Sequence, residues 1–231
     1  MNNEKKKKFS YFIGIAVAFV LPLSFYLIAK SLKKGHISMP PQFRFEKLQN
    51  GDSIFHQVKD ISLVNQLGDT VSLNKDLKGK ILVVDFIFTT CTSVCPQLTN
   101  NMKMLQLAFR KNPKRINNLE DTVQLISISV NPKVDTFQTL RVYADHHGVN
   151  HDKWWFLTGD KANIYDYARN ELGLSVEEGD GNTNDFIHSQ KLIVLDADRN
   201  IRGYYNGLDT GAISQCAYDV SLLTMEKKKK K

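Results

Sequence analysis

The sequence predicts an α/β fold in which helices flank a central mixed sheet. Two runs, residues 81–88 and 122–130, are apolar and rich in β-branched side chains, and they lack the alternation of a half-exposed strand. Such runs are typical of central strands that are covered on both faces. Segments with helical spacing of apolar residues follow each run, and this alternation predicts a sheet with helices on both sides.

The elements are predicted in chain order from turn residues and periodicity. Residues 61–64 and 70–73 flank Gly68-Asp69 and predict a short hairpin. After strand 81–88, Pro96 suits the first turn of a helix, in which Leu98, Met102, Leu105 and Phe109 recur at helical spacing.

The second half of the chain repeats this order and closes with a hairpin and a helix. The predicted elements are strand 122–130, helix 134–147, strand 154–157, helix 161–172, strands 190–195 and 201–205 around a turn at 198–200, and helix 213–225. Residues 175–185 are rich in Gly, Glu and Asp and predict a surface loop. With a thiol pair at the end of the first central strand, this order is typical of a thioredoxin-like fold.

Two cysteines, Cys91 and Cys95, stand four residues apart where strand 81–88 gives way to the helix. Residues i and i+4 share one face of a helix, so the two sulfurs can converge on a soft metal ion or close into a disulfide. Unpaired N–H groups at a helix N-terminus favour the thiolate, which is the species that binds metal or attacks a disulfide. The third cysteine, Cys216, is expected to pack in the last helix.

A histidine, His188, stands just before strand 190–195, at a place where no proline occurs because the last proline is Pro132. The topology brings the loop before that strand toward the cysteine loop. Two thiolates and one imidazole form a soft donor set that suits copper, and three donors suit Cu(I).

Other polar and aromatic residues have plainer expected roles. His146, His147 and His151 are expected at a solvated helix end. Asp135 is expected either to orient a loop or modulate the site, or to cap a helix. Trp154 and Trp155 are expected to pack.

The charge of the chain lies in its two tails. The formal net charge is +7, and the nine lysines at 5–8 and 227–231, offset by Glu4 and Glu226, account for all of it. The remaining body is formally neutral, so it lacks the clustered basic face that nucleic-acid binding needs.

Residues 9–29 are apolar except for two serines, and their length matches the roughly 20 residues that span a bilayer. Lysines at 5–8 precede this span and predict a cytoplasmic N-terminus, with the folded domain in the periplasm. The alternative is a cleaved signal peptide, but no small-x-small cleavage site follows the span. The predicted organisation is a basic tail (1–8), a transmembrane anchor (9–29), a linker (30–50), a thioredoxin-like domain (51–225) and a lysine-rich tail (226–231) expected outside the fold.

The chain resembles the Sco/SenC family, whose members are membrane-anchored thioredoxin-fold proteins that bind copper and assist cytochrome c oxidase assembly. The matching motifs are Cys-x-x-x-Cys-Pro at 91–96, His188-Ser189, Leu195-Asp196, the segment 129–136 and the segment 155–159. The chain departs from the family pattern at Thr92-Ser93-Val94, where Pro-Asp-Val is frequent, and at Asn131, where Asp is common.

The resemblance implies that Cys91, Cys95 and His188 are ligands of copper, as Cu(I) or Cu(II). It implies a metallochaperone at the cytoplasmic (inner) membrane that serves the copper-bearing subunit of the oxidase, together with other copper chaperones or thiol reductants. The alternatives are a thiol-disulfide oxidoreductase that uses Cys91 and Cys95 to reduce the cysteines of the oxidase copper site, and a redox or copper sensor.

Overall fold

The computed structural model describes residues 17–27, 38–49, 52–110, 119–174 and 190–229. The chain divides into two compact units, Met1–Ser38 and Met39–Lys231. In the first unit, residues 17–27 are helical. No helix within the described residues combines the length and apolar character needed to cross a bilayer. The ends of the predicted span, residues 9–16 and 28–29, lie outside the described part.

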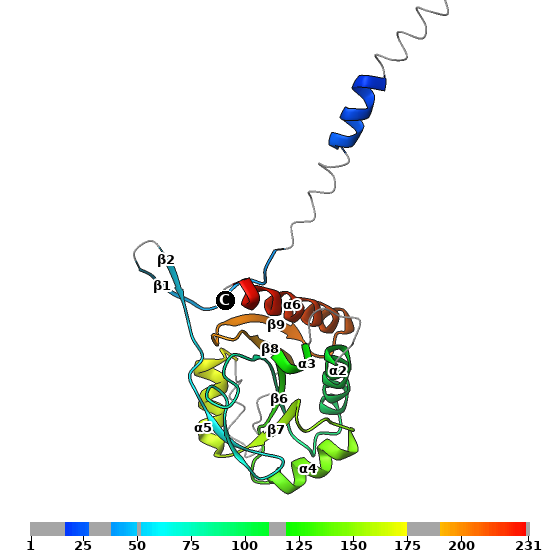
Figure 1. Cartoon of the computed structure of the whole chain (residues 1–231). Coiled ribbons are helices and arrows are strands. Elements are labelled where there is room, and N and C mark those ends of the chain that lie inside the picture. The colour runs from blue at the N-terminus through cyan, green and yellow to red at the C-terminus, as the bar shows by residue number, and fades with distance from the viewer. Residues whose placement is uncertain (1–16, 28–37, 50–51, 111–118, 175–189, 230–231) are drawn as a thin grey trace, which may run out of the picture. The chain divides into compact units, whose positions relative to one another are not determined.

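The second unit is built on a seven-stranded mixed sheet in the order β4-β3-β7-β6-β5-β8-β9. Figure 1 labels β6, β7, β8 and β9 of this sheet. The strands are β3 (Ser62–Asn65), β4 (Thr70–Ser72), β5 (Ile81–Ile87), β6 (Val123–Ser129), β7 (Trp154–Thr158), β8 (Lys191–Leu195) and β9 (Ile201–Asn206). Strands β5, β6 and β7 pair in parallel, whereas the flanking pairs are antiparallel. The predicted mixed sheet and its two terminal hairpins are therefore confirmed.

The middle of the sheet is the most buried part of the fold. Every residue of β5 and of β6 is buried, as the continuous apolar runs predicted. Each fully buried aliphatic side chain contributes roughly 1.5–3 kcal/mol to folding. These two strands therefore form a rigid base, and the segments that follow their carboxyl ends are held in fixed positions.

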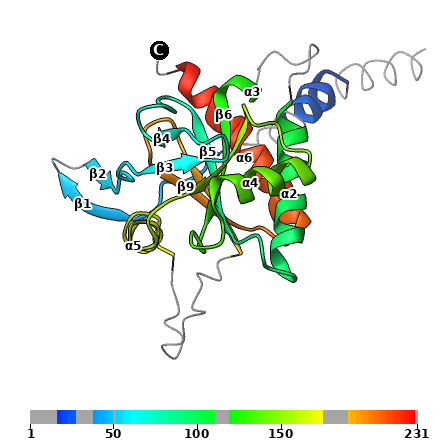
Figure 2. The ribbon, with the colours of Figure 1, turned by 90° about the horizontal axis from the view of Figure 1, so that it is seen from below.

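Helices cover both faces of the sheet, as predicted (Figure 2). One face carries α2 (Val94–Phe109), α4 (Phe137–His146) and α6 (Thr210–Lys229), with the short α3 (Leu119–Thr122) nearby. The other face carries α5 (Lys161–Asp166), which continues into a π-helical turn, η1 (Tyr167–Glu171). In α2 the predicted apolar stripe is buried, namely Leu98, Met102, Leu105 and Phe109.

A second, two-stranded sheet was not predicted. Strand β1 (Phe45–Gln49) pairs antiparallel with β2 (Asp52–Phe55), although residues 30–50 had been assigned to a linker. Asn50-Gly51 is a strong hairpin signal that would have found it. The chain just before the hairpin is also bound to the domain, since Phe43 N–H donates to Ile201 O at 2.9 Å and Arg202 Nη2 donates to Pro40 O at 2.6 Å. The linker prediction was wrong here because these partners are far away in sequence.

The C-terminal tail was also predicted incorrectly. Helix α6 runs to Lys229 rather than ending at 225, and Glu226 forms an ion pair of 2.9 Å with the buried Arg202. Lysine is a good helix former, and cations are favourable near a helix C-terminus. The lysine run can therefore extend the helix.

Candidate functional site

The two site cysteines lie at the carboxyl end of β5, in the turn that leads into α2. Cys95 is in the first turn of α2 and is 4% exposed, whereas Cys91 precedes the helix and is half-buried. The prediction that both lie on one helix face is thus wrong for Cys91. The sulfur is nevertheless placed at the helix N-terminus, because the backbone N–H of Cys95 points at Cys91 Sγ, with N and Sγ 3.5 Å apart. The two thiols are not joined in a disulfide.

The environments of the two thiols differ strongly. Partial burial alone would raise the pKa of Cys91, but hydrogen bonds from the Cys95 backbone N–H and from Ser93 lower it to about 7. Burial raises the pKa of Cys95 to about 12, and the neighbouring Cys91 adds to this rise. The pair therefore combines an accessible sulfur that is readily a thiolate with a buried sulfur that keeps its proton. This agrees with the predicted effect of a helix N-terminus on a thiolate.

The cysteine loop is tied to the next crossover of the sheet by Asp135, which is fully buried. Its carboxylate accepts hydrogen bonds from the backbone N–H and hydroxyl of Thr89, at 3.2 Å and 2.5 Å, and from Ser129 Oγ at 2.5 Å. The cap of α4 is Thr136, not Asp135. Among the roles expected for Asp135, the structure supports loop orientation and excludes capping of α4.

A second buried carboxylate, Asp85, was missed by the sequence analysis. It lies in the middle of β5, is fully buried, and accepts a hydrogen bond from Ser127 Oγ at 2.5 Å, while its Oδ2 has no partner among the described residues. Burial raises its pKa to about 7, although the Ser127 hydrogen bond lowers it. The sequence does contain a signal for this residue, because Asp85 is the single charged residue within the apolar run 81–88.

The third predicted ligand, His188, lies outside the described residues, as does the loop 175–185. The described chain resumes at Gln190, whose carbonyl accepts a hydrogen bond from Gly207 N–H at 2.7 Å. Gly207 O in turn accepts from Asn101 Nδ2 in α2 at 2.7 Å. Because β8 runs antiparallel to β5, its first residues lie at the end of β5 from which the cysteine loop departs. The start of β8 therefore lies at the end of the sheet that the prediction requires, and the placement of His188 itself stays a prediction.

The remaining candidate residues have structural contacts. His151 is bonded to Asp145 at 2.8 Å and to Gln66 at 2.9 Å, and the His147 ring lies against Tyr143 with centroids 4.5 Å apart. Cys216 and Trp154 are fully buried, as predicted, and burial raises the pKa of Cys216 to about 12. Within the described ranges, no three His, Cys, Asp or Glu residues are grouped so as to hold a metal ion.

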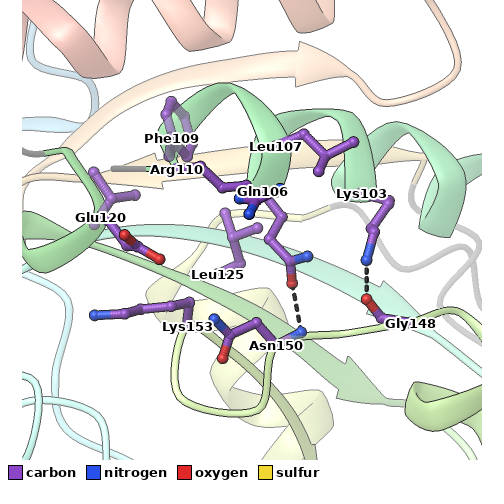
Figure 3. Close-up of a pocket in the computed structure, with 11 residues that line it drawn as sticks. Lys103, Gln106, Leu107, Phe109, Arg110, Glu120, Leu125, Gly148, Asn150 and Lys153 are labelled. Atoms are coloured by element: carbon purple, nitrogen blue, oxygen red, sulfur yellow. Dashed lines mark hydrogen bonds between the residues drawn. The ribbon is translucent and has the colours of Figure 1, made fainter. Parts of the chain in front are cut away.

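A cavity of about 260 Å³ lies beside α2 and offers no soft donor (Figure 3). Its wall includes hydrogen bonds from Lys103 Nζ to Gly148 O and from Asn150 N–H to Gln106 Oε1, the latter at 2.8 Å. The lining residues are Lys103, Gln106, Leu107, Phe109, Arg110, Glu120, Val123, Leu125, Gly148, Asn150 and Lys153. With neither cysteine nor histidine among them, this cavity is separate from the thiol pair.

The fold and the thiol pair together define a thioredoxin-like protein with a Cys-x-x-x-Cys site. Residues 52–220 match the SCO1/SenC family, and the chain belongs to that family. It is 30% identical over 170 residues to the SCO1 protein homolog of Bacillus subtilis. This match covers 73% of the present chain and 83% of the Bacillus protein.

Solved structures have the same fold. BsSco, described as a member of the Sco family of cytochrome c oxidase assembly proteins with a disulfide switch, is 29% identical, with a TM-score of 0.62 over 74% of this chain and 94% of its own. ScoI of Bradyrhizobium japonicum, solved with copper bound, has a TM-score of 0.56 over 72% of this chain and 99% of its own. At 24% identity, that second likeness shows the fold alone.

Proposed function

We propose that this protein binds copper through Cys91, Cys95 and His188 and delivers it to the copper centre of cytochrome c oxidase. The observation that carries the proposal is the thiol pair at the start of α2, together with membership of the SCO1/SenC family. In this role copper is cargo, and the oxidase subunit that receives it is the partner.

The chemistry of the pair supports copper as the cargo. Thiolates are soft ligands that favour Cu(I), and a neutral imidazole is acceptable to both valences. Cys91 has a pKa of about 7, so it supplies a thiolate near neutral pH, while Cys95 must release its proton on metal binding. Its half-buried position lets Cys91 exchange copper with a partner, while Cys95 is fixed in the core.

Copper titration of the reduced protein tests this proposal. The wild type should bind one copper ion, and Cys91→Ser/Cys95→Ser should lose stoichiometric binding because both soft donors are gone. Cys216→Ala is the matched control, since it removes the third, fully buried thiol and should leave binding intact. Retention of one copper by the double variant would refute the site.

The imidazole is tested separately. His188→Ala should weaken or distort the Cu(II) spectrum, because Cu(II) favours nitrogen donors more than Cu(I) does. His146→Ala, His147→Ala and His151→Ala serve as controls and should keep the wild-type spectrum. A change in one of these controls, with none in His188→Ala, would mean that the third ligand had been assigned wrongly.

A thiol-disulfide role at the oxidase copper site is the second candidate, and the unequal pKa values of the two thiols favour it. An accessible thiolate paired with a buried thiol is suited to attack and then resolve a disulfide. An insulin reduction assay beside the copper titration separates the two roles. A transfer protein should bind copper tightly and reduce insulin poorly.

We further propose that residues 9–29 anchor the protein in the cytoplasmic membrane with the domain in the periplasm. The support is the apolar span and the lysines at 5–8. A reporter that is active only outside the cytoplasm, fused after Met225, should be active. Activity of only the cytoplasmic reporter would reverse the topology and remove the oxidase role with it.

A further inference from the structure

The point where the chain enters the domain and the end of its last helix are held by one side chain, that of Arg202 in β9. Its Nη2 donates to Pro40 O at 2.6 Å, and its Nε donates to the same oxygen at 3.1 Å. Its Nη1 forms ion pairs with Glu226 Oε2 at 2.9 Å and with Asp196 Oδ2 at 3.1 Å. Because Arg202 is 4% exposed, these contacts are fixed parts of the fold. We call this place the entry corner (Pro40, Arg202 and Glu226).

Five consecutive lysines, residues 227–231, start at the entry corner. They follow Glu226 directly, and helix α6 continues into them as far as Lys229. The ion pair between Glu226 and Arg202 therefore fixes where the lysine run begins, although no contact of the lysines themselves is needed for this. The run adds a charge of +5 to a domain whose remaining body is formally neutral.

The acidic residues of α6 are engaged elsewhere. Glu226 is paired with the buried Arg202. Asp219, about two helical turns earlier, accepts hydrogen bonds from Tyr205 Oη at 2.7 Å and from Gln215 Nε2 at 2.9 Å. The helix thus offers its own lysine run no carboxylate that is not already bonded to another residue, and the run is suited to an anionic partner from outside the fold.

The entry corner lies at the end of the sheet away from the thiol pair. Leu82, near the start of β5, is paired with Leu195 of β8, and Leu195 is paired with Ile201 of β9. Arg202 follows Ile201 and so lies near the start of β5, whereas the cysteine loop leaves β5 after Ile87. The stretch of β5 from Leu82 to Ile87 is by itself roughly 16 Å long.

The length of the linker limits how far the entry corner lies from the proposed membrane anchor. The anchor, residues 9–29, ends eleven residues before Pro40. A fully extended chain of that length reaches at most about 40 Å. A tether this short keeps the lysine run at a high local concentration near the bilayer. Each lysine that comes close to an anionic membrane surface strengthens binding about fivefold.

We propose that the lysine run 227–231 binds the anionic phospholipid headgroups of the membrane that holds the anchor. This inference rests on the proposed anchor and adds an orientation to it. The linker and the lysine run together hold the entry corner at the lipid surface, so the other end of the sheet, with Cys91 and Cys95, faces the aqueous side. The thiols are then presented to the extramembrane part of a partner protein and not to the bilayer.

Energy transfer from a dye on the protein to a headgroup-labelled acceptor lipid tests the contact and the orientation. The full chain, in a Cys91→Ser/Cys95→Ser background that leaves only the fully buried Cys216, is placed in nanodiscs of phosphatidylcholine with or without phosphatidylglycerol. One dye is attached through Met225→Cys at the entry corner or through Ser93→Cys at the cysteine loop, two exposed positions.

Transfer from position 225 should rise when phosphatidylglycerol is present and should exceed transfer from position 93. The rise should be lost at about 1 M salt, where the Debye length is about 3 Å. Equal transfer from position 225 in the two lipid mixtures would overturn the lysine contact. Stronger transfer from position 93 than from position 225 would overturn the orientation.

Two matched double variants make the test specific. Lys227→Gln/Lys228→Gln should lose most of the rise caused by phosphatidylglycerol. Lys133→Gln/Lys191→Gln removes the same charge from the other end of the sheet, where Lys133 follows β6 and Lys191 begins β8, and should keep the rise. An equal loss in both variants would show that the overall charge of the domain, and not the lysine run, attracts the lipid.

The same preparation separates this inference from the proposals on which it rests. A chain that fails to enter the nanodiscs would refute the anchor and the lysine contact together. A chain that enters them but shows no effect of phosphatidylglycerol would refute the lysine contact alone. The copper titration of the wild-type protein is a separate measurement, so its outcome does not depend on either result.

Discussion

The two faces of the seven-stranded sheet use the same strands for different purposes. Side chains alternate along β5, so neighbouring residues enter different cores. We call one face the scaffold face (Leu82, Val84 and Phe86 of β5 with α5 and η1) and the other the thiol face (Ile81, Val83 and Ile87 of β5 with α2, α4 and α6). The thiol face contains both Cys95 and Cys216, and the alternation also places Asp85 there.

The difference shows how a core can hold chemistry without losing its packing. On the thiol face three polar side chains form a chain of hydrogen bonds: Trp154 Nε1 donates to Ser127 Oγ at 2.9 Å, and Ser127 Oγ donates to Asp85. Thr99 and Tyr143 likewise share a hydrogen bond of 2.9 Å between α2 and α4. The scaffold face stabilises the sheet by apolar burial, and the thiol face combines such burial with the site.

The largest expected effect is a difference in alkylation rate between Cys91 and the two buried thiols of the thiol face, Cys95 and Cys216. In the reduced protein at pH 7, about half of Cys91 is thiolate, against roughly 10⁻⁵ of Cys95 or Cys216. Alkylation of Cys91 should therefore be at least ~1,000-fold faster, as measured by mass spectrometry of peptides after timed iodoacetamide treatment. Comparable rates for Cys91 and Cys95 would erase the distinction between an accessible and a buried thiol.

The next effect concerns Asp85, the carboxyl group that is buried in the thiol face. The folded-state pKa of Asp85 is about 7, above its ordinary value of 3.8, so between these values the folded protein holds a proton that the unfolded chain has lost. The free energy of unfolding should therefore fall as the pH rises through this window, by about 1.4 kcal/mol per pH unit at most and up to about 4 kcal/mol in all. Asp85→Asn should flatten the pH dependence seen in urea unfolding from pH 4 to pH 8. An unchanged slope in the variant would show that Asp85 does not titrate in the folded state.

A smaller effect is expected from the scaffold face. Leu82→Ala removes a fully buried side chain and should reduce the free energy of unfolding by about 3 kcal/mol. Because Leu82 packs in the core away from the thiols, the alkylation rate of Cys91 in the folded variant should stay within about twofold of the wild-type rate. A much larger change in that rate would mean that the two faces are coupled through β5.

The prediction of elements succeeded where local patterns are strong. The apolar runs of β5 and β6, the helical spacing in α2 and the turn at Gly68-Asp69 are properties of short segments, so the sequence shows them directly. The β1–β2 hairpin was missed because Pro40-Pro41 favoured the assignment of residues 30–50 to a linker, and the Asn50-Gly51 turn signal was not used. The lysine-rich end was missed because its anchor, Arg202, belongs to a distant strand.

The sequence by itself determined the class of fold, the spacing of Cys91 and Cys95, and the resemblance to a family, because periodicity and motif spacing are local properties of the chain. Only the tertiary structure decided which thiol is accessible, which role Asp135 has, and that Asp85 is buried where its pKa is raised. The physical reason is that burial and hydrogen bonding are set by partners far away in sequence. Asp85 meets Ser127, the cysteine loop meets Asp135, and Arg202 meets Glu226 only once the chain has folded.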